Sequence, residues 1–283
     1  MTTPPAHPLA DDLALALRIA DRADAITMDR FNARDLVVAT KPDLTPVSDA
    51  DTAVELMIRD LVASERPADG VLGEEYPELL GTGGRRWIVD PVDGTKNFVR
   101  GVPVWATVIG LQDEHGRMVV GVVSAPALAR RWWASLGGGA WVDEPGATEP
   151  RRLSVSRVSS LGDASLSFSD HFSWDDIGRQ DQWDTLMKGV WRTRAYGDFW
   201  SHLMVAEGAL DIAAEPDLNL YDVAGVSVVV TEAGGRFTSV DGEDGPQHGS
   251  GVSTNELLHD AVIAALAPRP SHHASSAGAS STA

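Results

Sequence analysis

The chain has 283 residues, of which 43% are hydrophobic and 23% charged, and this balance is typical of a globular protein. Its 23 Lys and Arg residues against 41 Asp and Glu residues leave a formal net charge of −18, which argues against nucleic acid as a partner. The lack of cysteine excludes disulfides, thiolate metal sites and a thiol nucleophile. No apolar run approaches the roughly 20 residues that cross a bilayer, and no signal peptide is recognisable, so we expect a cytoplasmic protein that does not bind a membrane.

The first half of the chain predicts two helices followed by a meander of strands. Apolar residues recur at spacings of three and four over residues 13–31 and 48–64, which indicates amphipathic helices, and Ser48 is a suitable N-cap for the second. Short runs with strand character follow, together with a glycine turn at 137–139. The predicted strands are 70–73, 86–90, 102–111, 118–126 and 131–135.

The second half alternates strands with helices. Its predicted strands are 164–169, 191–195, 210–214 and 235–239, and its predicted helices are 183–188, 198–208, 221–233 and 255–266. This change of pattern predicts a mixed α+β and α/β fold in two subdomains. We place an N-terminal α+β subdomain at 10–146 and a C-terminal α/β subdomain at 150–267, and we expect the tails 1–9 and 268–283 to be disordered.

Two aspartates stand where an apolar strand ends, in the segment WIVDPVDGTKNF at residues 87–98. Asp90 and Asp93 are three residues apart around Pro91, and Gly94 permits unusual backbone angles after them. Two carboxylates and a turn carbonyl in one loop supply the hard oxygen ligands that Mg²⁺ prefers. Taken alone, the segment is equally compatible with an ordinary Asp-Gly turn.

Acidic residues mark the ends of two further predicted elements. Glu74 and Glu75 follow a strand at 71–73, and Asp222 lies in the first turn of the helix at 221–233. Each has a plainer interpretation, since exposed glutamates are solvated and an aspartate in a first turn interacts with the helix dipole. Three such acidic ends in one chain favour a shared metal site.

Gly197-Asp198, together with DGTKNF at 93–98 and VRGVP at 99–103, resembles the histidinol-phosphatase branch of the inositol monophosphatase superfamily. Three segments together resemble the signatures of the superfamily as a whole. They are GEEY at 73–76, WIVDPVDGTKNF at 87–98 and YDVAGVSVVVTEAGG at 221–235, in the family's order and at its separations. The resemblance covers residues 10–267 and implies a layered αβαβα sandwich of the inositol monophosphatase and fructose-1,6-bisphosphatase type. Tyr221 and Lys96 stand where many relatives have Trp and Thr, and neither replaces a ligand.

The resemblance implies a set of metal ligands. Glu74, Asp90 and the carbonyl of Val92 match one metal position. Asp90, Asp93 and Asp222 match a second, and Glu74 and Asp90 share a third, looser ion through water. The implied cofactor is Mg²⁺, two to three ions per site, with Mn²⁺ as a possible substitute.

The catalytic residues implied by the resemblance are Glu74, Thr95 and Asp51, which would orient and deprotonate an attacking water. Asp51 also suits the first turn of a helix, so a structural role is its alternative. We expect in-line attack of a metal-activated water on phosphorus, without a phosphoenzyme. A haloacid-dehalogenase-type phosphatase is disfavoured, because its D-x-D-x-T motif is one residue shorter than the D-P-V-D-G-T found here.

The residues implied to bind the substrate surround the metal ligands. They are Asp93, Gly94, Thr95, Arg194, Asp198, Glu215 and Asp222, with the amides of Gly94 and Thr95 as the phosphate cradle. Asp198 and Glu215 are suited to pair with the ammonium group of L-histidinol phosphate, whereas inositol offers only hydroxyls.

We therefore predict a Mg²⁺-dependent histidinol-phosphatase of histidine biosynthesis that acts on a small phosphorylated metabolite. Inositol-1-monophosphatase, or another small sugar-phosphate phosphatase, is the alternative within the family. A non-catalytic homologue that binds metal or phosphate is less favoured, because every predicted ligand is present. The family also implies a homodimer.

Overall fold

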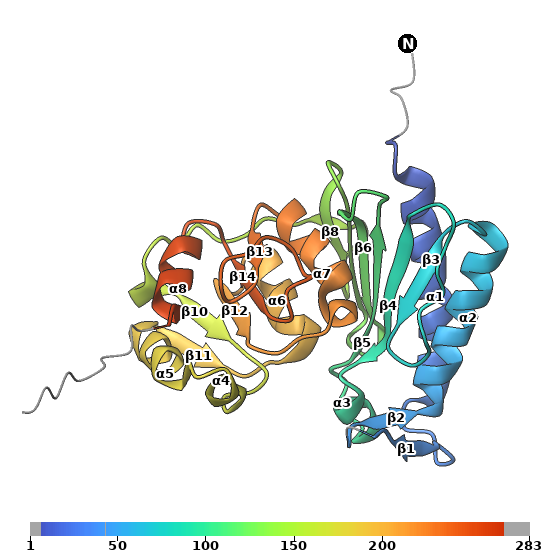
Figure 1. Cartoon of the computed structure of the whole chain (residues 1–283), viewed down its shortest axis with the longest axis horizontal. Coiled ribbons are helices and arrows are strands. Elements are labelled where there is room, and N and C mark those ends of the chain that lie inside the picture. The colour runs from blue at the N-terminus through green and yellow to red at the C-terminus, as the bar shows by residue number, and fades with distance from the viewer. Residues whose placement is uncertain (1–6, 43, 269–283) are drawn as a thin grey trace, which may run out of the picture.

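The structure is a computed structural model that describes residues 7–42 and 44–268. Within these residues, two β-sheets and their helices stack as five layers in the order helix, sheet, helix, sheet, helix (Figure 1). This is the layered αβαβα sandwich that the sequence predicts. Of the tails expected to be disordered, residues 1–6 and 269–283 lie outside the described part of the chain. No helix within the described part has the length and hydropathy needed to span a membrane.

The larger sheet is the second layer, with strand order β3-β4-β5-β6-β7-β8-β9. β3 and β4 are parallel, and the later neighbours are antiparallel. One face is covered by α1 (Ala10–Arg30) and α2 (Asp49–Glu65), and their side chains pack in one cluster with the strands, as Leu15, Ile58 and Ile109 do. The strands are β3 (Gly70–Gly73), β4 (Arg86–Asp93), β5 (Ala106–Gln112), β6 (Met118–Ala125), β7 (Arg130–Ser135), β8 (Gly139–Asp143) and β9 (Arg151–Arg152).

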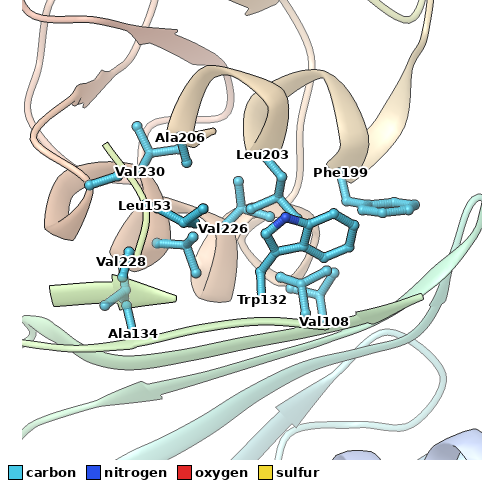
Figure 2. Packing of buried hydrophobic residues seen from close by; sticks show 14 of the residues in the cluster. Val108, Trp132, Ala134, Leu153, Phe199, Leu203, Ala206, Val226, Val228 and Val230 are labelled. Atoms are coloured by element: carbon cyan, nitrogen blue, oxygen red, sulfur yellow. The ribbon is translucent and has the colours of Figure 1, made fainter. Parts of the chain in front are cut away.

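The opposite face of the larger sheet is covered by α6 (Asp198–Ala206) and α7 (Leu220–Glu232), which form the middle layer. Figure 2 shows Phe199 of α6 beside Trp132 of β7, with further apolar side chains filling the space between helices and sheet. Trp132 is fully buried in this cluster, while Trp133 packs on the α1 and α2 side. The two tryptophans therefore point to opposite faces, as the alternation of a strand requires.

The smaller sheet is the fourth layer, with strand order β11-β10-β12-β14-β13. Its outer face is covered by the short helices α4, α5 and α8, whose apolar residues join Leu166, Ile212 and Val252 in one cluster. Its inner face meets α6, where Ala213 packs with Val205. The elements are β10 (Ser165–Ser167), α4 (Ser173–Asp176), α5 (Gln180–Gly189), β11 (Arg192–Arg194), β12 (Ile212–Glu215), β13 (Arg236–Thr238), β14 (Gly251–Thr254) and α8 (His259–Leu266).

The sequence predicts most of these elements to within a few residues and misses the shortest ones. A hairpin of β1 (Val38–Thr40) and β2 (Pro46–Ser48) precedes α2, and β8 begins inside the predicted glycine turn. The strands β9 and β14 and the helix α4 are also unpredicted, because so few residues carry no recognisable periodicity. The division into two subdomains stays a prediction, since β9 still belongs to the larger sheet and α7 of the second half packs on that sheet.

Glycines allow α7 to lie very close to the larger sheet. A Cβ atom on Gly225 would lie 2.5 Å from the carbonyl oxygen of Ile109. A Cβ atom on Gly121 would lie 2.2 Å from the carbonyl oxygen of Gly225. Backbone packed this tightly excludes any side chain at either position. The contact fixes the N-terminal end of α7, and with it Asp222, beside the end of β4.

We expect Gly225→Ala to destabilise the fold although alanine is the better helix former. The added methyl group clashes with backbone atoms of β5, so the free energy of unfolding falls by about 1–3 kcal/mol. Gly189→Ala is the matched control, because nothing lies within 4 Å of its Cβ position at the end of α5. Urea denaturation of both variants measures the difference, and equal stability would show that α7 has room to move.

Candidate active site

One cavity, with a volume of about 520 Å³, opens where the end of β4 meets the N-terminal ends of α6 and α7. Its lining is strongly acidic, with eight carboxylates against one lysine and one histidine. These residues come from segments far apart in the chain and from both sheets. The charged and titratable lining residues are Glu74, Asp90, Asp93, Lys96, Asp170, Asp198, His202, Glu215, Asp217 and Asp222.

The structure brings together nearly all of the site residues that the sequence predicts. Those that line the cavity are Glu74, Asp90, Val92, Asp93, Gly94, Thr95, Asp198, Glu215 and Asp222. Asp51 is fully buried behind Thr95 and does not reach the cavity wall. Arg194, at the end of the edge strand β11, is exposed and lies outside the lining, so the structure does not bring it to the other residues.

A β-bulge in β4 turns its two aspartates to the same side of the larger sheet. Residues three apart in a regular strand face opposite sides. Here Asp90 pairs with Val108 and Asp93 with Ala106, so β4 has one residue more than β5 between these pairs. Val108 and Ala106 both face the helices of the middle layer, and therefore so do both carboxylates. The bulge contains Pro91, which has no N–H to contribute to the ladder.

The turn after β4 is fixed by hydrogen bonds to these carboxylates. The backbone N–H of Val92 donates to Asp90 Oδ1 at 2.9 Å, and the N–H of Phe199 in α6 donates to Asp93 Oδ2 at 2.7 Å. Gly94 follows with a φ of 85°, a left-handed conformation that favours glycine, and the short helix α3 (Thr95–Val99) then begins. The turn is tied directly to α6 by the hydrogen bond from Phe199.

Thr95 and Asp51 form a pair at the back of the cavity. Thr95 Oγ1 lies 3.0 Å from Asp51 Oδ1 and 2.9 Å from the carbonyl oxygen of Val92, so its one proton is shared between two acceptors. The other oxygen of Asp51 accepts from the backbone N–H of Ser48 at 2.8 Å, within the capping box of α2. Asp51 therefore caps the helix, which is its structural role, and also holds the threonine hydroxyl, while its catalytic role stays a prediction.

Burial and mutual repulsion raise the pKa of the carboxyl groups in the cavity. The pKa values of Asp90 and Asp93 lie well above the ordinary 3.8, first because of desolvation and then because of neighbouring carboxylates. Desolvation also raises the pKa of Asp222 to about 7 and that of Asp198 to about 6, where the charge of Glu215 adds to the effect. So strong a cluster of like charges is typical of a site that binds cations.

Lys41, in the hairpin before α2, brings a positive charge to the acidic residues that follow β3. Its Nζ lies 2.6 Å from Glu74 Oε1 and 2.8 Å from Glu75 Oε1. No three acidic or histidine side chains of the described residues are arranged so that they could together hold a metal ion. The donor atoms nevertheless suit a hard cation, because they are carboxylate oxygens that line one cavity.

Lys41 and Glu55 are two further residues around the site that the sequence analysis does not identify. Glu55 is fully buried in α2 and accepts from the side chain of Arg59 at 2.8 Å and from the backbone N–H of Glu75 at 2.7 Å. It therefore anchors the turn that carries Glu74. The spacing of Glu55 and Arg59 is visible in the sequence, but such pairs usually lie on a helix surface. Nothing in the sequence indicates that the hairpin with Lys41 reaches Glu74.

The profile of the inositol monophosphatase family matches residues 9–271. The chain belongs to this family. It is 58% identical to the histidinol-phosphatase of Mycobacterium tuberculosis, over 90% of this chain and 98% of that protein. It is 54% identical to the histidinol-phosphatase of Streptomyces coelicolor, over 92% of this chain and 98% of that one.

The fold agrees with the family. The crystal structure of the extragenic suppressor protein SuhB from Bartonella henselae superposes with a TM-score of 0.81 at 28% sequence identity, covering 91% of this chain and 98% of that chain. Proteins of the inositol monophosphatase family are generally metal-dependent phosphoric monoester hydrolases. The acidic cavity is therefore the candidate active site.

We expect Glu55→Ala to weaken both the fold and the site. The substitution leaves Arg59 without its buried partner, which costs about 3–5 kcal/mol of unfolding free energy, and it releases the turn that carries Glu74. The apparent metal affinity falls about 10- to 100-fold, as is usual when a partner of a ligand is lost.

Glu65→Ala, at the exposed end of the same helix, is the control for this variant. It removes only a surface contact with Arg18 and changes the stability by about 1 kcal/mol or less. Urea denaturation and metal titration of activity measure both effects. Equal losses in the two variants would contradict an anchoring role for Glu55.

Proposed function

We propose that this protein is a Mg²⁺-dependent phosphomonoesterase that hydrolyses L-histidinol phosphate to L-histidinol and phosphate. One observation carries the proposal: acidic residues from the ends of β3 and β4 and from the start of α7 line the same cavity as Asp198 and Glu215. The similarity to two proteins named histidinol-phosphatase, over nearly their whole length, supports the choice of substrate. A cytoplasmic homodimer is part of the same proposal.

The negative charge of the cavity requires a cation before a phosphate can bind. Two unit charges of like sign about 4 Å apart repel by roughly 1–4 kcal/mol, depending on the effective dielectric constant. A phosphate dianion in this cavity is repelled by several carboxylates at once. Lys96 is the one lysine in the lining that could offset this repulsion. Bound Mg²⁺ would reverse the sign of the local charge, whereas the single positive charge of one lysine is too small to do so.

The residues that would hold the metal are those that the sequence predicts. Glu74, Asp90 and the carbonyl of Val92 would hold one ion, Asp90, Asp93 and Asp222 would hold a second, and Glu74 and Asp90 would share a third through water. When bound, Mg²⁺ lowers the pKa of a coordinated water and stabilises the leaving oxygen, and Mn²⁺ is able to replace it. Lys41 contacts the same carboxylate of Glu74, so its ammonium group would compete with a metal ion for this ligand.

The chain's own groups orient the water and the phosphate. The Thr95 hydroxyl, held by Asp51, accepts a hydrogen bond from the water and passes its own proton toward the buried carboxylate, while Glu74 orients the water. The amides of Gly94 and Thr95 face the phosphate oxygens at the start of α3. These groups direct the water in line with the scissile P–O bond, and no phosphoenzyme forms.

The alcohol side of the cavity suits a cationic leaving group. Asp198 and Glu215 both line this cavity. Burial raises the pKa of Asp198 first, and the like charge of Glu215 raises it further. An ammonium group that pairs with both relieves this repulsion. L-Histidinol phosphate carries such a group, and inositol 1-phosphate does not. This favours the histidinol ester over the inositol ester.

We expect kcat/KM for L-histidinol phosphate to exceed that for inositol 1-phosphate by at least about 100-fold, which corresponds to two hydrogen-bonded charge contacts. Phosphate release in the presence of Mg²⁺ measures both rates, and EDTA abolishes both. A ratio near one, or one that favours inositol, would overturn the substrate assignment. Turnover that persists in EDTA would overturn the metal dependence.

We expect Asp93→Asn to reduce turnover more than about 100-fold while the protein stays folded. The asparagine carbonyl still accepts the hydrogen bond from Phe199, so the contact with α6 survives while the charge is lost. Asp176→Asn removes the same charge from an exposed position in α4 and keeps full activity. Phosphate release and thermal melting distinguish the two effects, and an active Asp93→Asn enzyme would exclude Asp93 as a ligand.

A further inference from the structure

His202 lines the cavity, and no role has been assigned to it above. It lies in α6 one helical turn after Asp198, which is also in the lining. The residues that follow each of them, Phe199 and Leu203, pack beside Trp132 on the larger sheet (Figure 2). Spacing of four along a helix places Asp198 and His202 on one face. One face of α6 thus fills the core, and the neighbouring face offers two polar side chains to the cavity.

A hydrogen bond with Ser253 determines which ring nitrogen of His202 carries the proton. Ser253 Oγ, on β14, is fully buried and lies 2.7 Å from Nδ1 of His202. Among the described residues no other partner of this hydroxyl is present, so its proton has an acceptor only if it donates to Nδ1. The ring then carries its own proton on Nε2. This nitrogen lies on the far side of the ring from Nδ1 and faces Glu215, another residue of the cavity lining.

The Nε2 atom of His202 faces a carboxylate oxygen that it does not bind. Glu215 Oε1 lies 3.5 Å away, and within the described residues neither atom has a hydrogen-bond partner. His202 is 1% exposed and Glu215 is 6% exposed, so both groups are largely removed from bulk water. Buried donors and acceptors are rarely left unpaired, and an unpaired pair in a cavity wall indicates a place for a ligand.

We propose that His202 is a specificity-determining residue that, together with Glu215, binds the nitrogen-bearing end of the substrate's alcohol. Its Nε2–H donates to an uncharged ring nitrogen of the ligand, while Glu215 accepts from an N–H or ammonium group beside it. Ser253 acts as a positioning residue, because it holds the tautomer that makes His202 a donor. The ligand class is a phosphate ester whose alcohol combines a heteroaromatic acceptor with a cationic donor. This inference rests on the proposed function and deepens it.

The choice of substitution separates ligand binding from packing. His202→Asn keeps a polar atom near the position of Nδ1, where it meets Ser253, but has nothing at the position of Nε2. His202→Gln reaches the position of Nε2 with an amide donor. His115→Asn is the matched control, because this histidine is exposed in the turn between β5 and β6, far from the cavity lining.

Calorimetric titration with L-histidinol and with inorganic phosphate, each in the presence of Mg²⁺, measures the binding affinity of the alcohol side and of the phosphate side of the cavity separately. We expect His202→Asn to weaken L-histidinol binding about 10- to 100-fold, the loss of one buried hydrogen bond to a polar ligand, with a much smaller change for phosphate. His202→Gln recovers part of the affinity, and Ser253→Ala loses an intermediate amount. His115→Asn binds L-histidinol as the wild type does.

Two results would overturn the proposal. L-Histidinol affinity within about twofold of wild type in His202→Asn would mean that water fills the position. Equal weakening of L-histidinol and phosphate would mean that His202 only supports the fold. A separate measurement tests the proposed function itself. That function is wrong if the wild-type protein hydrolyses inositol 1-phosphate instead of L-histidinol phosphate. That result would also refute the ligand class proposed for His202, because inositol has neither a heteroaromatic acceptor nor a cationic donor.

Discussion

The whole site depends on holding carboxylates of like charge close together in a poorly hydrated cavity. Desolvation and mutual repulsion raise the pKa of Asp90 and Asp93, so the ionised cluster opposes folding until a cation joins it. The chain resists this repulsion with contacts outside the cavity. Glu55 anchors the turn before the cluster, and glycines let α7 lie directly on the larger sheet. Cation binding and the integrity of the fold are therefore linked.

The bulge in β4 shows how a small backbone feature creates the site. In a regular strand, two aspartates three residues apart would face opposite sides of the sheet, and one of them would lie among the apolar residues beneath α1 and α2. Pro91 favours the bulge, since it removes a ladder hydrogen bond in any case. The spacing of three between the aspartates, which also excludes the shorter D-x-D-x-T arrangement, is thus a structural requirement.

The sequence predicts the layers and the acidic cluster because both depend on features that are local in the chain. Long amphipathic helices, strand runs and acids at strand ends carry their own signals, and they identify Glu74, Asp90, Asp93 and Asp222. The missed features depend on tertiary contacts. The contact of Lys41 with Glu74, the pairing of β14 with β12 and the environment of His202 each bring together segments that are distant in the chain. Arg194 shows the opposite error, since proximity in sequence to Asp198 does not bring it into the cavity.

The two ends of the cavity come from different layers, and hydrogen bonds join them, among them one from Asn97 Nδ2 to Asp198 Oδ2 at 3.1 Å. The larger sheet supplies the metal and phosphate side, while α6 and the smaller sheet supply Asp198, His202 and Glu215. The N–H of Phe199, in the first turn of α6, donates to Asp93 at 2.7 Å, so the side formed by α6 is placed directly against a proposed metal ligand. The distance from phosphorus to the far end of the alcohol is thereby fixed by a rigid connection. The phosphate side is formed by the segments that resemble the family's signatures. Discrimination between phosphate esters therefore depends on the few side chains that α6, β12 and β14 contribute to the other side of the cavity.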